Sequence, residues 1–396
     1  MNILFLCHRL PFPPKRGGKI RPFNIIRHFS DSGHKVTVGS LARSEQEKRE
    51  GAGLEDHCEK VLIGTIGRVG ALAQMVGRLP TGSPSSMGYF YSRTLHRLVR
   101  QEAATSNFDL VFVHCSSAAQ YARHVSDAAS ILDFGDMDSQ KWLDYSRFRS
   151  FPLSAGYWLE GTKLLAAEKK LARQFDLSTC TTKAEFDTLG ELNSAQRTGW
   201  FPNDVDAEYF SPGEQAHDPD LICFVGRMDY YPNQHAMQMF CDNVLPGIHR
   251  ERPNTKLIIV GAEPSADIWS LGDRPGITVT GTVDDVRDYV RSAALTVAPL
   301  AIARGTQNKI LESMALGVPV VSSTTAAGGV DAVAGQHIVT ASTNDEYVES
   351  IVEILGNPEK RAKLAAAARD NVTKKHNWVE SMTRLDHIVD SSGIIR

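Results

Sequence analysis

The chain has 396 residues, more than one ordinary hydrophobic core holds, so two domains are expected. Its composition, 42% hydrophobic and 22% charged, is that of a globular protein, which excludes disordered and fibrous classes. The net charge of −3 is uneven, with +6 in residues 1–203 and −9 in residues 204–396. A basic half suits an anionic membrane surface or nucleic acid, but ordinary surface variation explains such a difference as well.

The cysteines and the N-terminal residues bear on the compartment. Six cysteines are scattered without zinc spacing, and Cys7, Cys115 and Cys223 lie in apolar, strand-like runs. We therefore expect a reducing cytoplasm. The chain opens with a strand-like run instead of a signal peptide, and no run reaches the roughly 20 apolar residues of a membrane span. Any membrane contact is expected to be peripheral, on the inner face of the plasma membrane.

Short apolar runs alternate with helical patterns along the whole chain. This alternation predicts the α/β class, with two doubly wound parallel sheets in series. The strands expected in the first half are Ile3–Cys7, Lys35–Ser40, Lys60–Gly64, Leu110–His114, Ala129–Phe134, Leu177–Cys180 and Gln196–Phe201. Those expected in the second half are Leu221–Val225, Lys256–Val260, Ile277–Thr280, Leu295–Ala298, Val318–Ser322 and His337–Val339.

A proline-rich loop follows the first strand and ends in Gly17 and Gly18, before a helix predicted over Ile20–Ser32. Two glycines let a backbone approach a ligand closely, but they also form an ordinary turn. The spacing is not G-x-G-x-x-G, so a dinucleotide site of the usual kind is disfavoured. Further on, residues 66–100 mix apolar, aromatic and arginine side chains. Such a segment can lie on a membrane surface, or it can be a buried helix with solvated arginines.

The fourth strand ends in His114, at the sheet edge where open α/β sheets place ligands. Asp133, Asp136 and Asp138 follow the next strand. Three carboxylates at this spacing can bind a divalent metal, contact an acceptor, or cap the following helix, for which Asp138 or Ser139 is a good N-cap residue.

In the second half, Gly226 and Arg227 follow a buried strand. Gly226 permits a tight strand-to-helix turn, and Arg227 can hold a diphosphate through two hydrogen bonds. A segment at 304–321 predicts loop, helix, turn and strand, with a C-cap at Gly317. The helix N-terminus there attracts phosphate, Lys309 adds a charge, and Glu312 can accept hydrogen bonds from a sugar. An i,i+3 ion pair between Lys309 and Glu312 is the simpler alternative.

Several of these segments resemble, in the right order, the retaining glycosyltransferases of family four, which have the GT-B fold. They are the Pro…Gly-Gly loop, the linker Phe201–Pro212, the Gly226-Arg227 turn and the run Glu312-Ser-Met-Ala-Leu-Gly-Val-Pro-Val-Val321. The resemblance implies two Rossmann-like domains facing a cleft. These would be an acceptor domain over 1–203, a nucleotide-sugar donor domain over 204–375, and a C-terminal segment over 376–396 that packs back on the first domain as a helix (Asn377–Asp390).

Roles for individual residues are also implied by the resemblance. The family has Glu where this chain has Arg304, and often Lys where it has Asn233, so Lys309 is inferred to supply the second cation. The expected catalytic residues are His114, Arg227, Lys309 and Arg304. The expected donor-binding residues are Gly17, Gly18, Gly226, Val283, Thr306, Gln307, Asn308 and Glu312, and the expected acceptor-side residues are Asp136 and Asp138.

The implied reaction moves a sugar, with retention, from a UDP- or GDP-linked donor to an acceptor expected to be a lipid-linked glycan. The details Arg304-Gly-x-Gln-Asn-Lys309 and Asp-Phe-x-Asp-x-Asp138 further resemble the sugar transferases of bacterial exosortase and exopolysaccharide gene clusters. No cofactor, obligatory metal or nucleic acid is expected. Two alternatives stay open: a sugar-nucleotide epimerase of the same fold, and an inactive nucleotide-sugar-binding scaffold.

Overall fold

The computed structural model describes residues 1–14 and 17–395, and its contacts divide the chain into two compact units. The first unit combines Met1–Pro202 with the residues from Met382 onward, and the second is Asn203–Ser381. The last helix, α17 (Trp378–Ser392), is therefore shared, and most of it belongs to the first unit. Lys15 and Arg16 of the glycine loop lie outside the described residues.

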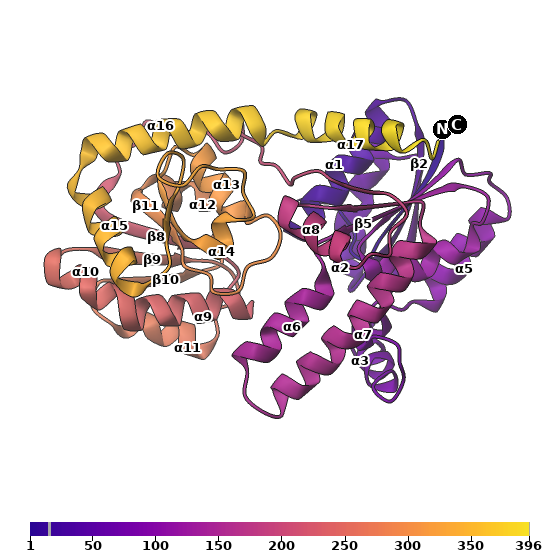
Figure 1. Cartoon of the computed structure of the whole chain (residues 1–396), viewed down its shortest axis with the longest axis horizontal. Coiled ribbons are helices and arrows are strands. Elements are labelled where there is room, and N and C mark those ends of the chain that lie inside the picture. The colour runs from indigo at the N-terminus through magenta and orange to yellow at the C-terminus, as the bar shows by residue number, and fades with distance from the viewer. Residues whose placement is uncertain (15–16, 396) are drawn as a thin grey trace. The chain divides into compact units, whose positions relative to one another are not determined.

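The first unit is built on a seven-stranded parallel sheet in the order β3-β2-β1-β4-β5-β6-β7 (Figure 1). Every strand expected from the sequence is present, with ends that differ by up to two residues. The strands are β1 (Asn2–Cys7), β2 (Lys35–Ala42), β3 (Lys60–Thr65), β4 (Leu110–His114), β5 (Ala129–Gly135), β6 (Leu177–Cys180) and β7 (Thr198–Trp200). Its helices are α1 (Gly17–Asp31), α2 (Glu45–Glu50), α3 (Arg68–Gly77), α4 (Ser85–Tyr89), α5 (Arg93–Ala103), α6 (Asp138–Phe148), α7 (Leu153–Gln174) and α8 (Lys183–Glu191), with 3₁₀ turns η1 (Gly51–His57) and η2 (Ser116–His124).

The second unit holds a six-stranded parallel sheet in the order β10-β9-β8-β11-β12-β13. Its strands are β8 (Asp218–Val225), β9 (Lys256–Val260), β10 (Ile277–Gly281), β11 (Ala293–Ala298), β12 (Val320–Ser323) and β13 (Val339–Ala341). Its helices are α9 (Tyr231–Met239), α10 (Leu245–Glu251), α11 (Ala266–Trp269), α12 (Val286–Arg291), α13 (Asn308–Ala315), α14 (Thr324–Ala327), α15 (Asn344–Gly356) and α16 (Pro358–Lys375), with the π turn η3 (Phe240–Val244) and the 3₁₀ turn η4 (Ser270–Asp273).

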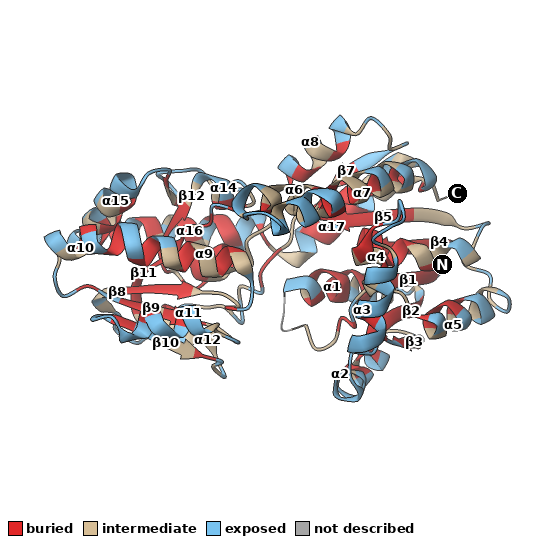
Figure 2. Cartoon of the chain, turned by 90° about the horizontal axis from the view of Figure 1, so that it is seen from below, coloured by how far each residue is buried: buried red, intermediate tan, exposed pale blue. Residues whose placement is uncertain are grey.

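Both sheets confirm the predicted doubly wound α/β class, and each reverses its strand order beside its first strand. The reversal lies between β1 and β4 in one sheet and between β8 and β11 in the other. Strands β4 and β11 are buried along their whole length, as expected for parallel strands covered on both faces (Figure 2). Ligands of such folds bind outside the carboxyl ends of the strands at this reversal.

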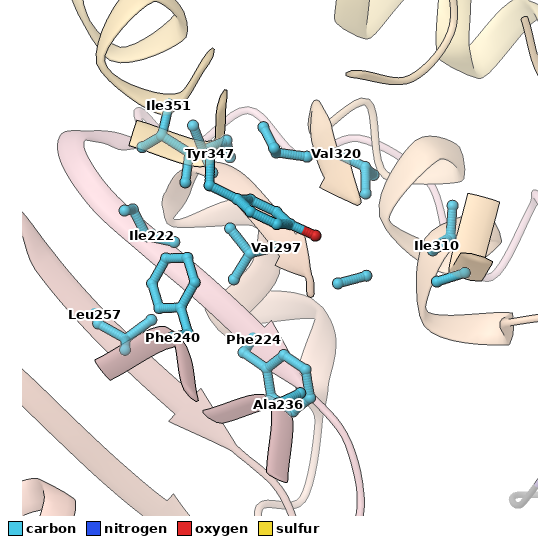
Figure 3. Packing of buried hydrophobic residues seen from close by; sticks show 14 of the residues in the cluster. Ile222, Phe224, Ala236, Phe240, Leu257, Val297, Ile310, Val320, Tyr347 and Ile351 are labelled. Carbon is cyan, nitrogen blue, oxygen red and sulfur yellow. The ribbon is translucent and has the colours of Figure 1, made fainter. Parts of the chain in front are cut away.

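The core of the second unit fixes the helix that carries the predicted donor site. Side chains of β8, β9, β11 and β12 pack with Ile310 of α13 and with Tyr347 and Ile351 of α15 (Figure 3). Ile310, Leu311 and Met314 are fully buried, so the apolar face of α13 is anchored in this core. The opposite side of the helix, with Lys309 and Glu312, is left to the site.

Three element ends differ from the sequence prediction for local reasons. Helix α1 begins at Gly17, three residues before the expected start at Ile20, so the glycines belong to its first turn. Gly317 has a positive φ of 71°, as predicted for a C-cap, and the cap extends to Val318, because the Gly317 and Val318 N–H groups donate to the carbonyls of Met314 and Ser313. Strand β12 therefore starts at Val320 instead of Val318. Among the described residues, none of the helices has the length and apolarity that crossing a bilayer requires.

Candidate functional site

The N-terminus of α13 presents polar groups that the described residues leave without partners. Gln307 occupies the N-cap position, and its side chain makes no capping hydrogen bond. Thr306 Oγ1 and Asn308 Oδ1 are both buried and have no hydrogen-bond partner within the described part of the chain. Buried polar atoms are nearly always paired, so these two mark a place where a ligand completes the bonding. The helix N-terminus adds unpaired amide groups and a partial positive charge.

Lys309 projects from the first turn of α13 and is held by Asn233 of α9. Its Nζ donates to Asn233 Oδ1 at 2.6 Å, while Asn233 Nδ2 donates to the Arg227 carbonyl at 2.8 Å. A Cβ on Gly226 would lie 2.7 Å from Asn233 Nδ2 and 2.9 Å from Lys309 Nζ, so only glycine fits at this turn. Asn233 stands where the resembled family often has lysine, and it contacts Lys309, the residue that was inferred to supply the missing cation.

Burial shifts the pKa of both charged groups on α13 toward neutrality. Desolvation lowers the pKa of Lys309 to about 7 and raises the pKa of Glu312 to about 7, and each charge partly offsets the shift of the other. The hydrogen bond of Lys309 goes to Asn233 and not to Glu312, so the i,i+3 ion-pair alternative does not describe the contacts here. A bound anion beside Lys309 would favour its charged form.

Arg227 is engaged by two carboxylates in this structure. Its Nε and one Nη donate to Asp229 at 2.9 and 2.7 Å, and the same Nη donates to Glu263 at 2.5 Å. Arg227 thus makes with Asp229 the pair of hydrogen bonds that was expected with a diphosphate. Neither acidic partner was anticipated, because Glu263 lies 36 residues along the chain from Arg227. Arg227 can hold a diphosphate only by exchanging at least one of these carboxylates.

The remaining predicted donor residues lie at the ends of the second sheet. Gly281, with φ of 71°, ends β10, and a Cβ there would lie 3.2 Å from the indole of Trp269, which is 48% exposed. Val283 follows and is partly buried against the apolar cluster beneath it. Arg304 is half-buried, and its carbonyl accepts a hydrogen bond from Gln307 Nε2 at 3.0 Å. The exposed Trp269 was not singled out from the sequence, where no motif marks it.

In the first unit, His114 belongs to a buried network centred on Asp133. His114 Nδ1 lies 2.7 Å from Asp133 Oδ2, Arg21 donates to both carboxylate oxygens at 2.8 Å, and Thr179 Oγ1 donates to Oδ1 at 3.0 Å. Burial alone would raise the pKa of Asp133, but Arg21 and His114 outweigh it and hold the pKa well below its usual range. The carboxylate thus fixes the His114 tautomer that keeps the proton on Nδ1, leaving Nε2 for chemistry.

Two members of this network were missed from the sequence. Arg21 also donates to the carbonyls of Phe201 and Pro202, at 3.0 and 3.3 Å, and stacks 3.6 Å from the Phe201 ring centroid. His8 follows β1 directly, 6.3 Å from His114 between ring centroids, with its Nδ1 buried and without a partner among the described residues. Burial lowers the pKa of His8 well below its ordinary value. The position of His8 directly after the first strand was the sequence signal that could have identified it.

The carboxylates after β5 do not form a metal site or a helix cap. Among the described residues, no cluster of three or more His, Cys, Asp or Glu side chains can hold a metal ion. Asp136 accepts from Thr181 Oγ1 at 2.8 Å, burial raises its pKa, and Asp138 accepts from the Cys115 thiol. The predicted N-cap role of Asp138 or Ser139 is wrong, since Met137 is the N-cap residue.

Two glutamates from distant helices accept the amide hydrogen bonds that a cap would take. Glu185 of α8 accepts from Met137 N–H at 2.8 Å, and Glu168 of α7 accepts from Ser139 N–H at 3.0 Å. Burial raises the pKa of Glu168 to about 8. A local sequence pattern could not reveal a cap supplied from residues 29 and 48 positions away.

The glycines of the first helix have space around them. A Cβ on Gly18 would lie 3.7 Å from the Arg9 guanidinium, an ordinary contact, so the protein itself does not require glycine there. Gly17 is exposed at the start of α1. A cavity of about 510 Å³ lies at the carboxyl ends of β1, β2 and β3, and Lys19, Arg43, Glu47, Arg68 and Tyr89 are among its lining residues. None of the predicted site residues lines it.

Comparison with known proteins bears on the second unit in particular. Residues 219–357 match the family described as glycosyl transferases group 1. The second unit is thus similar to group 1 glycosyltransferase domains over most of its length. Its match covers the α9 and α13 segments that bring Asn233 and Lys309 together.

A curated protein with a similar sequence is named as a glycosyltransferase. The D-inositol 3-phosphate glycosyltransferase of Nocardiopsis dassonvillei is 27% identical over 255 residues, covering 57% of this chain and 58% of the relative. The chain thus matches somewhat more than half the length of this curated relative.

Solved structures match the fold over nearly the whole chain. Sucrose-phosphate synthase from Thermosynechococcus elongatus has a TM-score of 0.71 at 16% identity, covering 99% of both chains. Anabaena HepE, solved with UDP and glucose, has a TM-score of 0.70 at 16% identity, covering 99% of this chain and all of HepE. The two Rossmann-like units are those of GT-B glycosyltransferase structures.

Proposed function

We propose that this protein transfers a sugar from a nucleotide diphosphate sugar to an acceptor hydroxyl, with retention at the anomeric carbon. The observation that carries the proposal is the N-terminus of α13 in the group 1 domain. There Lys309 is held by Asn233, and Thr306 and Asn308 keep buried polar atoms that the described residues do not satisfy. The Lys309 ammonium, the Thr306 hydroxyl and the helix-terminal N–H groups can donate to the oxygens of a diphosphate, whereas Asn308 Oδ1 is an acceptor and suits a hydroxyl group of the donor.

The chemistry needs stabilisation of the charge that develops on the departing diphosphate. Preorganised cations and helix-terminal amides aimed at that charge supply the largest share of such catalysis. Lys309 is positioned before the ligand arrives, because Asn233 fixes its Nζ. Arg227 joins when diphosphate oxygens replace a carboxylate of Asp229 or Glu263. Glu312, one turn further along α13, accepts hydrogen bonds from the ribose.

The first unit is assigned to the acceptor, with His114 oriented by Asp133 and with Asp136 and Asp138 at the same sheet edge. We propose a lipid-linked glycan acceptor in bacterial exopolysaccharide or cell-surface glycan synthesis, at the inner face of the plasma membrane. The support is the basic charge of residues 1–203 and the resemblance of the Arg304-to-Lys309 segment. No divalent metal is needed in this scheme, and activity in excess EDTA tests that point.

The donor is tested by thermal shift against UDP, GDP and their sugar conjugates. A nucleotide at a hundred times its dissociation constant stabilises the fold by roughly 2.7 kcal/mol, which is readily detected. HepE, which shares the fold, was solved with UDP, so UDP sugars are the first to try. The preferred donor is then incubated with lipid-linked acceptors, where a new α-glycoside supports the proposal. An altered donor sugar without transfer would identify an epimerase instead. If neither a new glycoside nor an altered sugar forms, the protein would be a scaffold.

Arg304 offers a second test, because it stands where the family has glutamate. If Arg304 contacts the donor, Arg304→Glu places a carboxylate near the diphosphate. Two like charges about 4 Å apart repel by about 4 kcal/mol at an effective dielectric constant of about 20. We expect Arg304→Glu to lose most turnover and Arg304→Lys to lose part of it, measured as initial rates with the preferred donor. An Arg304→Glu variant as fast as wild type removes Arg304 from the donor site.

A further inference from the structure

Helix α3 in the first unit leaves one apolar face uncovered. Val69 is 82% exposed, Leu72 44% and Val76 55%, and their spacing of three and four residues places them on one side of the helix. Leu79, 51% exposed, follows the helix end. Ala71 is buried and packs the other side onto the unit. The helix is therefore apolar both where it is covered and where it faces outward.

The turn between α6 and α7 exposes a second apolar group. These helices run side by side as a hairpin that extends from the first unit (Figure 1), and parts of the hairpin are exposed (Figure 2). Phe151 is 82% exposed, Leu153 55%, Trp158 58% and Leu159 39%. Single exposed apolar residues are ordinary, but a contiguous group that includes two large aromatic rings marks an interaction site.

Hydrogen bonds tie these two parts together. Lys163 Nζ of α7 donates to the carbonyls of Leu79 and Arg78, at 2.8 and 3.3 Å. Glu160 of α7 accepts from the N–H groups of Ser85 and Ser86, each at 2.8 Å. The segment after α3 is thus fastened to α7, and we treat the two exposed apolar groups as one surface. We call it the α3–α7 surface: Val69, Leu72, Val76, Leu79, Phe151, Leu153, Trp158 and Leu159.

The charges around this surface are mainly basic, although Arg147 pairs with Asp144 and the buried Glu160 lies on α7. Residues 60–101 contain six Lys or Arg and no Asp or Glu, and Arg68 opens α3. Residues 145–159, at the hairpin turn, contain Arg147 and Arg149 and no acidic residue. Apolar side chains among arginines bind the headgroup region of anionic bilayers, where Trp and Phe rings are also favoured. A second copy of the same cationic surface would be repelled by this one.

We propose that the α3–α7 surface docks on an anionic lipid bilayer, with its apolar side chains at headgroup depth and its arginines among the lipid phosphates. The inference deepens the proposed function, since it names how a lipid-linked acceptor would be reached. Vesicle binding itself needs neither donor nor transfer. Its outcome is therefore independent of whether the second unit binds a nucleotide sugar.

The test is flotation of the full chain with vesicles of phosphatidylcholine, with and without phosphatidylglycerol. We expect binding to the anionic vesicles only, falling as salt shortens the Debye length from about 10 Å at 0.1 M to about 3 Å at 1 M. Phe151→Ser with Trp158→Ser should weaken it by about tenfold or more, as should Val69→Ser with Val76→Ser. The matched control is Val379→Ser, because Val379 is 79% exposed on α17, outside the surface, and this variant should bind like wild type.

Other results would overturn the proposal. These are the absence of binding at low salt, binding unchanged in both double variants, or binding weakened equally in the Val379 control. If light scattering shows that the wild type is a dimer and that the surface variants are monomers, the surface binds a second copy of the chain instead. Calorimetry with UDP on the same variants separates the two proposals. If the variants bind UDP normally but miss the vesicles, the surface alone is affected, while a wild type that binds vesicles but no nucleotide contradicts only the proposed function.

Discussion

In the first unit, the polar groups bonded to Asp133 satisfy one another, whereas polar atoms at the N-terminus of α13 in the second unit have no partner among the described residues. Asp133 accepts hydrogen bonds from Arg21 and Thr179 and pairs with His114, all within the protein. At α13, Lys309 has a neutral partner, and Thr306 and Asn308 keep buried atoms that no described residue bonds. The first arrangement holds its own structure in place, and the second is where we propose that a ligand binds.

This difference predicts opposite responses to mutation. Removing one member of a satisfied buried pair strands the other charge, so it costs stability. Removing a buried cation that has no anionic hydrogen-bond partner costs the fold little, because burial of that charge was unfavourable from the start. Removing a charged group should therefore lower the stability of the fold at Asp133, whereas at Lys309 it should lower activity without lowering stability.

The largest effect is expected for Asp133→Asn, which leaves the Arg21 guanidinium buried without its anion. We expect a loss of about 3–5 kcal/mol in the free energy of unfolding, measured by urea denaturation. Asp187→Asn is the control in the same unit, because its ion pair with Lys183 is exposed on both sides and is worth less than about 1 kcal/mol. Equal losses in both variants would contradict a structural role for the buried network.

Lys309→Met should show the reverse pattern. The fold should be as stable as wild type or slightly more so, while turnover falls by about 10²–10³-fold, about 2.7–4 kcal/mol of transition-state stabilisation. Lys256→Met is the control, since Lys256 is an exposed lysine of the same unit, paired with Asp218. Initial rates and thermal unfolding of the two variants decide the matter. A destabilised Lys309→Met with normal turnover would make Lys309 structural.

Glu312→Ala sharpens the assignment of the ribose. Losing a hydrogen bond to a charged group should weaken nucleotide binding by about 1.5–3 kcal/mol in calorimetric titration. The informative comparison is the preferred nucleotide against its 2′,3′-dideoxy analogue. Wild type should favour the ribose form, and Glu312→Ala should bind the two alike. If the variant still discriminates between them, another residue holds the ribose.

The smallest effect is the pH dependence of donor binding. Because burial lowers the pKa of Lys309 to about 7, its charge is present below that pH and is lost above it. Burial raises the pKa of Glu312 to about 7, so its charge is lost as the pH falls below that value. Donor affinity should therefore peak near pH 7 and fall by up to about tenfold per pH unit on either side. In Lys309→Arg, which keeps its charge, donor affinity should no longer fall above pH 7 but should still fall below it. A wild-type donor affinity that does not change with pH would contradict the donor-binding roles of both Lys309 and Glu312.

The sequence predicted the parts of this molecule that depend on local pattern. All the strands, the C-cap at Gly317 and the two-sheet class follow from apolar runs and turn residues, and the structure confirms them. The proximity of Lys309 to Asn233 was not visible, because 76 residues separate them. The Arg21–Asp133 pair spans 112 residues. No local periodicity encodes such contacts, which arise only when the strands assemble.

The site residues likewise divide into those that local sequence identifies and those that only long-range packing defines. The polar loop before α13 was recognised from its composition, but which of its atoms stay unsatisfied depends on packing. Glu263 beside Arg227 and the glutamates that cap α6 were not anticipated, since each comes from a distant part of the chain. Asp138 was assigned a capping role by its position in the chain, whereas the folded unit supplies carboxylates from α7 and α8.

The first unit is discontinuous in sequence, and this has a consequence for synthesis on the ribosome. Ile388 of α17 lies where a Cβ on Gly199 would meet it at 2.6 Å, Arg384 stacks 3.5 Å from the Trp200 ring centroid, and His28 bonds to Asp386 at 2.9 Å. Strand β7, at the sheet edge, is thus covered by residues translated about 180 positions later. Until those residues emerge, the nascent first unit leaves this part of β7 and α1 uncovered, and surface exposed during folding is what chaperones protect.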